Sequence, residues 1–225
     1  MMMRAVAILL CLCGIINTSA AELQSDNIYK CGVGDEKKIA LTFDDGPHPE
    51  YTPRILSVLE EYSVTATFFL IGDNAAAYPE IVKKEVEMGC ELGNHTKSHR
   101  HIKDLCYDEL IKEMNDAESQ IRSITGRSPN YFRPPEGVCT KNVGKAAMEK
   151  GYFVILWTVD TRDWEAPPAN QIVKSVKENL RPGAIILFHD YVYGSSETAD
   201  ALKEIIPYVL SEGYEIVSLN ELLGI

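Results

Sequence analysis

From residue 38 onward, short apolar segments alternate with longer amphipathic segments through almost the whole chain. The apolar segments read as buried strands, and the amphipathic segments place aliphatic side chains at helical spacing. Near-continuous apolar strands separated by helices indicate a parallel sheet covered by helices. The expected strands are 38–43, 66–71, 90–94, 130–133, 152–159, 184–188 and 214–219, and the expected helices are 49–62, 78–88, 108–124, 141–150, 170–180 and 198–212.

The N-terminus has the pattern of a signal peptide. A short basic start is followed by an apolar run at 5–16 and by small residues that favour cleavage after Ala20 or Ala21. The run is shorter than the roughly 20 apolar residues that span a bilayer, which argues against a membrane anchor. We therefore expect a cleaved leader at 1–20, a lead-in segment at 21–37 and one domain at 38–225. The mature protein is expected to be secreted or held at the cell wall, without membrane contact.

The net charge of −11 limits the kinds of partner. A protein that binds nucleic acid through the phosphates would carry a basic face, and docking on an anionic membrane needs the same. The composition therefore argues against nucleic-acid binding and against docking on an anionic membrane, and it is compatible with a neutral polymer as the partner. At 225 residues the chain suits one domain with a sizeable core, and we expect it to be a monomer.

Two of the six cysteines, at positions 11 and 13, lie in the expected leader. An even number of cysteines in an exported domain favours two disulfides, for which four cysteines allow three connectivities. None has Cys-x-x-Cys spacing, which argues against a cysteine zinc site or a redox pair. The four in the mature chain are Cys31, Cys90, Cys106 and Cys139.

Side chains that bind metals or move protons gather where the expected strands end. In parallel α/β folds, active sites assemble at the C-terminal ends of the strands, so residues far apart in sequence converge there. Chance placement at five strand ends is improbable. The residues are Asp44, Asp45, Asn94, His95, Arg133, Asp160, His189 and Asp190.

Two histidines and an aspartate have the composition of a metal site. His95 and His99 are four residues apart, and on a helical turn such positions share a face, so both rings reach one ion. With an aspartate from another strand end they make a His-His-Asp set, which leaves a coordination position open, as catalytic zinc sites require. His101 is offset from the pair, and we expect it to be a solvated loop residue.

Other strand ends carry an arginine that can orient a carboxylate, a histidine that can transfer protons and a tryptophan that can contact a ligand. Arg133 precedes two prolines that stiffen the turn, and its guanidinium is expected to hold the Asp44 carboxylate ionised and oriented. His189 supplies a third imidazole at the end of the strand 184–188. Trp164, beyond a further strand end, is expected to wall a pocket or to stack on a sugar face.

In this order, the segments 42–47, 95–99, 133–137, 160–164 and 187–189 resemble the five motifs of the NodB-type polysaccharide deacetylases, carbohydrate esterase family 4. The pattern is most similar to the chitin deacetylases in this family, and the resemblance covers roughly residues 38–219. It implies a distorted (β/α) barrel with fewer than eight complete units, which suits about seven parallel strands with outer helices better than an open sheet does.

The resemblance also implies roles for individual residues. Asp45, His95 and His99 would hold a divalent metal, usually zinc, with cobalt or manganese in some members. Asp44 would be the general base and His189 the general acid. Arg133 would brace Asp44, and Asp163 would orient His189. The expected substrate-binding residues are Pro134, Glu136, Trp164 and Leu187, the last two of which would line the pocket for the acetyl methyl group.

Glu136 departs from the pattern, because the family often has an aromatic residue after the two prolines. In the family, the backbone N–H at this position donates a hydrogen bond to the oxyanion, and this N–H is present whatever the side chain. A carboxylate here is expected to discourage anionic substrates and to attract the ammonium group of a deacetylated unit.

The function expected from these residues is metal-dependent hydrolysis of N-acetyl groups in a GlcNAc polymer, chitin before others, with release of acetate. The same site suits a peptidoglycan N-deacetylase or an acetylxylan O-esterase, and these alternatives stay open. A non-catalytic wall carbohydrate-binding protein is disfavoured because every catalytic position is filled. A metal storage or sensor protein would not need Arg133 or His189.

Overall fold

The structure is a computed structural model that describes residues 27–225. The expected leader at 1–20 and the first part of the expected lead-in segment lie outside the described residues. Between Asn27 and Ile225, no helix combines the length and the apolar character that crossing a membrane requires.

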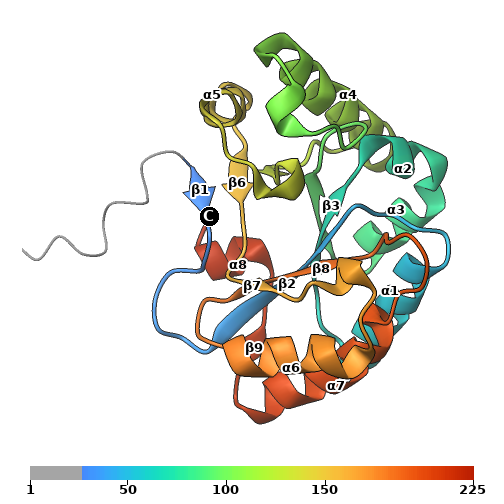
Figure 1. Cartoon of the computed structure of the whole chain (residues 1–225), viewed down its shortest axis with the longest axis vertical. Coiled ribbons are helices and arrows are strands. Elements are labelled where there is room, and N and C mark those ends of the chain that lie inside the picture. The colour runs from blue at the N-terminus through green and yellow to red at the C-terminus, as the bar shows by residue number, and fades with distance from the viewer. Residues whose placement is uncertain (1–26) are drawn as a thin grey trace, which may run out of the picture.

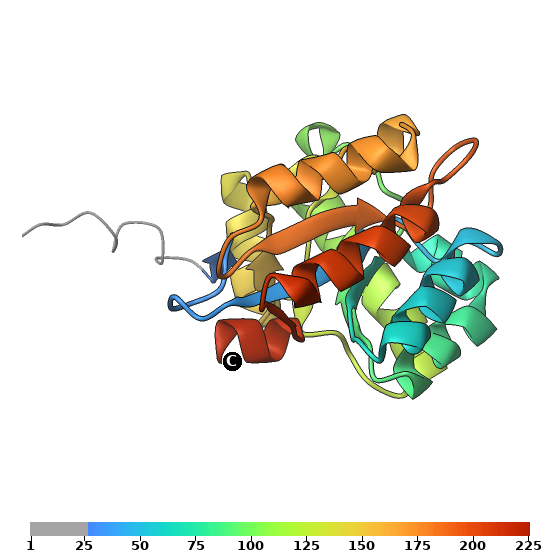
Figure 2. The ribbon, with the colours of Figure 1, turned by 90° about the horizontal axis from the view of Figure 1, so that it is seen from below.

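A curled parallel sheet forms the centre of the molecule, and the helices lie on its outside (Figures 1 and 2). Within the described residues it has nine strands, in the order β1-β6-β5-β4-β3-β2-β8-β7, with β9 beside β2. Every strand pairing is parallel. The strands are β1 Ile28–Tyr29, β2 Lys38–Asp44, β3 Thr67–Leu70, β4 Glu91–Asn94, β5 Tyr131–Phe132, β6 Phe153–Ile155, β7 Val159–Asp160, β8 Ile185–His189 and β9 Glu215–Ile216.

The helices follow the strands in the alternation expected from the sequence. Gly126 and Gly151 end α4 and α5 in the left-handed conformation, which glycine adopts without a steric penalty. The α-helices are α1 Tyr51–Tyr62, α2 Gly72–Ala77, α3 Pro79–Glu87, α4 Tyr107–Thr125, α5 Lys141–Lys150, α6 Ala169–Asn179, α7 Thr198–Ser211 and α8 Leu219–Leu223. The short 3₁₀ helices are η1 Ile102–Asp104, η2 Pro135–Gly137 and η3 Asp163–Glu165.

Strand β2 lies inside the sheet, between β3 and β8, and its side chains form part of the core. Its residues from Ile39 to Asp44 are all buried, and Phe43 stacks on Phe68 of β3 and Phe188 of β8 at ring-centroid distances of 5.0 and 5.4 Å. Burial on both faces is what a near-continuous apolar strand requires. The end of β2 therefore lies between the ends of β3 and β8, where Asp44 pairs with Phe69 and His189 in the register.

The curled sheet does not close by regular pairing between its outermost strands β1 and β7. An isolated antiparallel bridge between Cys31 and Ala184 joins the segment after β1 to the start of β8. This arrangement is the distorted (β/α) barrel that we expected, with short additional strands at its margins.

Two of the expected strands were wrong in their extent. The segment 152–159 is two strands, because the carbonyls of Ile155 and Leu156 accept hydrogen bonds from Arg133 at 3.0 and 3.2 Å instead of continuing a ladder. The chain then passes from one margin of the curled sheet to the other, so that β6 pairs with β5 and β7 pairs with β8. In the segment 214–219 only Glu215–Ile216 is strand, and Ser218 caps the helix α8 that follows.

Three short elements were missed from the sequence. β1 lies in the expected lead-in segment and pairs with β6, while α2 and α8 are too short to show helical periodicity. Each is stabilised by contacts with the rest of the domain rather than by its own sequence pattern.

The expected disulfides are not present, since Cys31, Cys90, Cys106 and Cys139 are all free thiols. Cys90 is buried at the start of β4, and burial raises the pKa of its thiol to about 11. Cys106 is exposed and takes part in the N-terminal cap of α4. These two cysteines occupy separate local environments, which the even cysteine count did not reveal.

Candidate active site

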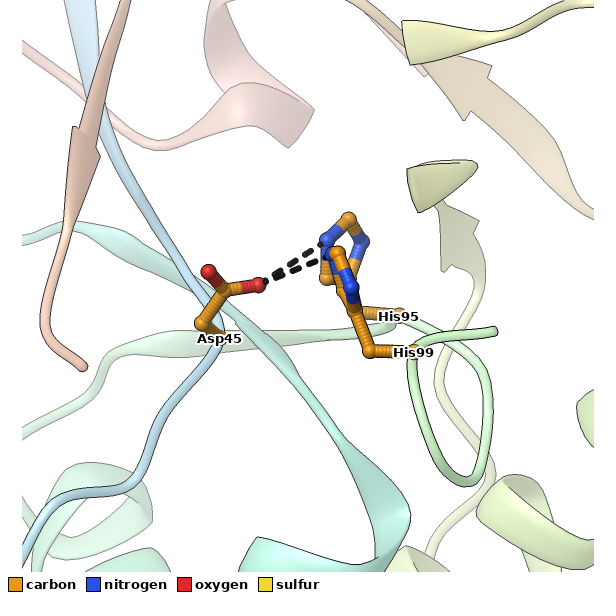
Figure 3. Close-up of side chains that lie close together, drawn as sticks. All are labelled: Asp45, His95 and His99. Atoms are coloured by element: carbon orange, nitrogen blue, oxygen red, sulfur yellow. Dashed lines mark ion pairs between the residues drawn. The ribbon is translucent and has the colours of Figure 1, made fainter. Parts of the chain in front are cut away.

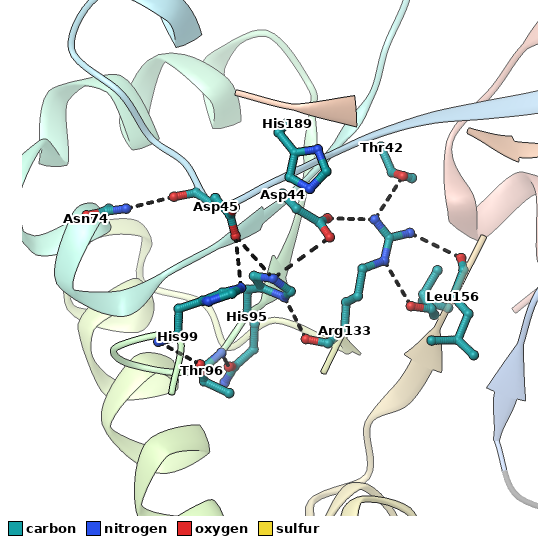
Figure 4. Close-up of polar contacts among 12 residues, drawn as sticks. Thr42, Asp44, Asp45, Asn74, His95, Thr96, His99, Arg133, Leu156 and His189 are labelled. Atoms are coloured by element: carbon teal, nitrogen blue, oxygen red, sulfur yellow. Dashed lines mark hydrogen bonds and ion pairs between the residues drawn. The ribbon is translucent and has the colours of Figure 1, made fainter. Parts of the chain in front are cut away.

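The expected site residues converge at the C-terminal edge of the sheet (Figure 4). Asp44 ends β2 and His189 ends β8, and these two residues are direct neighbours in the parallel register. His95 follows β4, Arg133 follows β5, and Asp163 begins η3 after β7. The convergence inferred from the strand ends is therefore present in the structure.

Asp45, His95 and His99 form a compact set of metal-ligating groups (Figure 3). Asp45 Oδ1 lies 3.3 Å from Nε2 of both histidines, and the ligand atoms all lie within 4.8 Å of one another. Asp45 Oδ1 is buried and has no hydrogen-bond partner among the described residues. A buried carboxylate oxygen without a partner is costly, and a divalent cation would satisfy it. The three residues therefore fit a metal.

The two histidines meet in a loop and not on the helical turn that we expected. The segment 95–100 is irregular, and Thr96 and His99 both adopt left-handed backbone conformations, with φ of 67° and 53°. Asn94 Oδ1 accepts from the Thr96 N–H at 2.9 Å, and Thr96 Oγ1 accepts from the His99 N–H at 3.2 Å. This tight turn brings the imidazole centroids within 5.0 Å.

A hydrogen bond fixes the tautomer of His95. Its Nδ1 lies 2.7 Å from the carbonyl oxygen of Arg133, which can only accept, so Nδ1 carries the proton. In the neutral ring the lone pair of Nε2 then faces Asp45, as ligation requires. Burial and the neighbouring His95 lower the pKa of His99, which favours its neutral, ligating form.

The backbone at Asp45 is held from two sides. Asn74 Nδ2 donates to the carbonyl of Asp45 at 2.7 Å, and Asp45 itself has a left-handed φ of 76°. The carboxyl of Asp190 lies against Gly46, where an added Cβ would come within 2.0 Å of Asp190 Oδ2, so only glycine fits. Thr52 Oγ1 donates to the same oxygen at 2.6 Å. Burial raises the pKa of Asp190 to about 7.

Arg133 is fully buried and makes four hydrogen bonds. Its Nη1 donates to Asp44 Oδ1 at 2.6 Å and to Thr42 Oγ1 at 3.0 Å, and its other two bonds reach backbone carbonyls before β7. The guanidinium also lies over the ring of Phe69, 4.1 Å from its centroid. Burial acts to lower the pKa of Arg133, and the Asp44 carboxylate opposes it. Arg133 thus holds one oxygen of Asp44 and leaves Oδ2 on the side of His95, 3.9 Å from its Nε2.

His189 is oriented by Asp163. Its Nδ1 lies 2.8 Å from Asp163 Oδ1, and Asp163 Oδ2 accepts from the His189 backbone N–H and from Thr198 Oγ1 at 2.8 and 2.7 Å. Burial alone would lower the pKa of His189, but the hydrogen bond and charge of Asp163 outweigh it and raise the pKa to about 9. His189 is therefore protonated at neutral pH, with Nε2 available for donation.

These groups open into a hollow of about 410 Å³, which we call the catalytic hollow. Leu187 is buried in its wall, Trp164 is half exposed at its rim, and Pro134 is buried directly behind the turn of η2. Trp157 and Asp160 also line it. Of the four expected substrate-binding residues, Glu136, Trp164 and Leu187 line this hollow, and Pro134 does not.

Glu136 has an unusual backbone and an exposed side chain at the catalytic hollow. Its φ of 59° is left-handed, and its N–H donates to no other residue in the part of the chain described. Its carboxylate pairs with His101, at 2.8 Å between Oε1 and Nδ1. His101 is exposed, as expected of a loop residue, but it links the metal-ligand loop to the turn at Glu136.

Some residues of the site were not singled out from the sequence. Thr42 lies two positions before Asp44 on β2 and so shares its face, a strand periodicity that could have shown that both side chains reach Arg133. Asn74 lies in α2, a helix that the sequence did not predict, and no sequence signal marked its contact with Asp45. Trp157 is usually read as a core residue, yet it lines the catalytic hollow.

Comparisons with known proteins identify relatives of the whole domain. The family profile described as Polysaccharide deacetylase matches residues 32–155. A peptidoglycan-N-acetylglucosamine deacetylase from Bacillus cereus is 39% identical over 191 residues, covering 84% of this chain and 89% of the relative. A chitooligosaccharide deacetylase from Bradyrhizobium sp. (strain ANU 289) is 37% identical over 202 residues, covering 84% and 92%.

The fold is also that of solved relatives. The crystal structure of the Bc1960 peptidoglycan N-acetylglucosamine deacetylase, bound to an N-hydroxybenzamide compound, superposes with a TM-score of 0.86 at 36% identity. The match covers 88% of this chain and 94% of that one. Both the barrel and its arrangement of strands are thus shared with this protein.

Proposed function

The chain belongs to the polysaccharide deacetylase family, carbohydrate esterase family 4, whose members are divalent-metal-dependent hydrolases, and we propose that it removes N-acetyl groups from a GlcNAc polymer. The products are acetate and a free amine. The proposed metal is zinc, because two imidazoles and one carboxylate with an open position are typical of catalytic zinc sites.

One observation carries the proposal. Asp44 and His189 lie side by side at the ends of adjacent strands, and each is oriented by its own buried partner, Arg133 and Asp163. A site that only bound metal would need neither group. A base and an acid that flank one cation site are what hydrolysis of an amide requires.

In the proposed hydrolysis, the site residues bind the metal, accept a proton and stabilise the developing oxyanion. Asp45, His95 and His99 would hold a divalent ion, which would supply polarisation of the substrate's amide carbonyl and a lower pKa for the attacking water. Asp44 accepts the proton of the attacking water through Oδ2, while Arg133 holds Oδ1. The N–H of Glu136, which has no partner among the described residues, would donate to the developing oxyanion.

His189 completes the reaction. In its protonated state it donates a proton to the departing nitrogen, so that the amine leaves neutral. Its pKa of about 9 keeps this proton in place at neutral pH, and Asp163 keeps the ring oriented. Each of these two general acid–base groups typically contributes a factor of 10²–10⁴ to the rate.

We propose chitin as the polymer, ahead of peptidoglycan. The catalytic hollow is lined by Glu136 and Asp160 and by no lysine or arginine of the described chain. Such a surface favours a neutral saccharide over one with lactyl or peptide carboxylates near the acetamide. The leader pattern at 1–20 supports export of the protein to the cell surface or medium.

The test is acetate release by the zinc-loaded protein from chitin oligomers, peptidoglycan and acetylated xylan. The proposal predicts the highest kcat/KM on chitin oligomers and loss of all activity with EDTA. Preference for xylan would make the protein an O-esterase, and preference for peptidoglycan would overturn the chitin assignment. Absence of acetate from all three, with metal bound, would indicate a non-catalytic wall protein.

A further inference from the structure

The metal-ligand loop, residues 95–99, joins the two histidines of the proposed metal site without forming a helix or a strand. Thr96 and His99 both have left-handed φ angles, of 67° and 53°. Residues other than glycine keep this conformation only where the surrounding structure imposes it. The contacts that hold the metal-ligand loop therefore also decide whether His95 and His99 face Asp45 (Figure 3).

Helix α2 holds the first part of the metal-ligand loop through the main chain. The N–H groups of Gly72 and Asp73 donate to the carbonyls of Thr96 and Lys97 at 3.0 and 2.9 Å. These N–H groups belong to the first turn of α2, where no intrahelical acceptor is available to them. Because backbone atoms make both contacts, this part of the loop is held whatever its side chains are.

Helix α4 holds the end of the loop next to His99 through the side chain of Glu113. Glu113 Oε2 accepts from the backbone N–H of Ser98, and Glu113 Oε1 accepts from Ser98 Oγ, both at 2.9 Å. Glu113 is only 9% exposed, so water competes little for these two bonds. Two hydrogen bonds between one carboxylate and one residue define both the position and the direction of the chain just before His99.

The charge of Glu113 is not used in an ion pair. None of the ion pairs within residues 27–225 includes it, and its neighbour Lys112 pairs with Asp116. A carboxylate is costly to remove from water unless hydrogen bonds replace the water, and here the bonds from Ser98 do so. The carboxylate therefore serves the metal-ligand loop, and its negative charge adds to the attraction of the site for a cation.

We infer that Glu113 is a positioning residue of the metal site. Through Ser98 it holds the metal-ligand loop in the conformation that places the imidazoles of His95 and His99 against Asp45, without itself touching the metal. The inference rests on the proposed function only in that it requires these three residues to hold a divalent ion. Removal of a group that orients metal ligands typically lowers metal affinity by a factor of about 10–100.

The test measures the zinc affinity of the full chain by competition with a chromophoric chelator, with no substrate present. Glu113→Ala is expected to weaken zinc binding by a factor of about 10–100. Glu113→Gln keeps the size of the side chain and one acceptor oxygen, so it should weaken zinc binding by a smaller factor. Ser98→Ala removes the hydroxyl and keeps the backbone N–H, so its zinc affinity should also lie between those of the wild type and Glu113→Ala.

Two variants of the same helix are the matched controls. Asp116→Asn removes a carboxylate that pairs with Lys112 and not with the loop, so it controls for the loss of charge. Ile121→Val shortens a buried side chain, so it controls for a loss of stability. Both are expected to keep the zinc affinity of the wild type, although Ile121→Val lowers the free energy of unfolding in EDTA.

A positioning role also predicts that Glu113 and Ser98 are coupled. Ser98→Ala should weaken zinc binding less in the Glu113→Ala background than in the wild type, because the bond that it removes is already absent there. The absorption spectrum of the cobalt-loaded protein reports the arrangement of the ligands around the ion. This spectrum should change in Glu113→Ala and stay the same in Ile121→Val.

Wild-type zinc affinity in folded Glu113→Ala would overturn the inference. If Glu113→Ala does not fold, unchanged zinc affinity in both Glu113→Gln and Ser98→Ala would overturn it in the same way. Weakened zinc binding in the Glu113 variants of a protein that releases no acetate from chitin, peptidoglycan or xylan would uphold the inference and refute the proposed function.

Discussion

Arg133 and Asp44 form a buried ion pair in which Nη1 of the arginine lies 2.6 Å from Oδ1 of the aspartate, with the two side chains 0% and 5% exposed. Asp44 ends β2 and Arg133 follows β5, so this one ion pair connects two strands of the barrel and also positions the proposed base. The pair holds the proposed base in one orientation and directs its second oxygen toward the metal ligands.

Arg133→Met is expected to destabilise the domain by about 3–5 kcal/mol, because it leaves the Asp44 carboxylate buried and unpaired. Urea unfolding in EDTA measures this. Arg54→Met is the matched control, since Arg54 pairs with Asp200 at 3.0 Å on the surface, where such pairs contribute about 0–1 kcal/mol. A similar loss of unfolding free energy in Arg133→Met and Arg54→Met would show that the buried pair of Arg133 with Asp44 does not stabilise the domain more than a surface pair does.

Asp163→Asn is expected to move the alkaline limit of activity to lower pH. The hydrogen bond and charge of Asp163 are the main causes that raise the pKa of His189, which reaches about 9 with the added charges of Asp44 and Asp45. The protonated ring is the proposed acid, so the rate falls as the pH rises through that value. Without the carboxylate the pKa of His189 drops, and the fall in kcat/KM begins at a lower pH. A pH profile of acetate release checks this, and an unchanged alkaline limb would exclude Asp163 from tuning the acid.

Asp190→Asn is expected to change how stability depends on pH. Burial raises the pKa of Asp190 to about 7 in the folded protein, above its ordinary value near 4. The folded state thus binds a proton more tightly than the unfolded state, so this contribution to stability is present at low pH and is lost as the pH rises through about 7.

The measurement is the free energy of unfolding in EDTA between pH 5 and pH 8. The wild type should lose more stability over this range than Asp190→Asn, by an amount on the order of a few kcal/mol. Asp35→Asn, at an exposed position, should follow the wild type. Parallel curves for the wild type and Asp190→Asn would contradict the assignment.

Glu136→Gln is expected to relax discrimination against anionic substrates. The substitution keeps the size of the side chain and an acceptor for His101, and it removes only the charge at the catalytic hollow. The ratio of kcat/KM for chitotetraose to that for a peptidoglycan fragment should fall several-fold, as expected for an exposed charge, and the fall should shrink at high salt. A ratio that does not change would remove Glu136 from substrate selection.

The sequence predicted a parallel sheet covered by helices and the convergence of the site residues, because apolar strands alternate with helices and polar residues follow the ends of the strands. The choice of a barrel over an open sheet came mainly from the family resemblance. The contact between Arg133 and Asp44 could be predicted from the sequence because each residue lies at the end of an expected strand. The hydrogen bonds that orient His189 were expected only through the family resemblance. In the structure they arise where η3 and α7 meet the end of β8.

The errors arise where tertiary contacts override local patterns. His95 and His99 have helical spacing, but left-handed residues in a loop bring them together. The apolar run 152–159 is interrupted because Arg133 takes its carbonyls, which no pattern within the run reveals.

In the proposed mechanism Asp44 acts as the base while Asp45 holds the metal, although the two residues are adjacent and chemically identical. The most direct test is acetate release from chitotetraose by Asp44→Asn and Asp45→Asn, with zinc content measured on the same samples. Asp44→Asn is expected to retain zinc and to lose a factor of about 10²–10⁴ in kcat, whereas Asp45→Asn is expected to lose zinc affinity and to recover activity when the zinc concentration is raised. Near wild-type turnover by zinc-loaded Asp44→Asn, or loss of zinc from that variant, would contradict it.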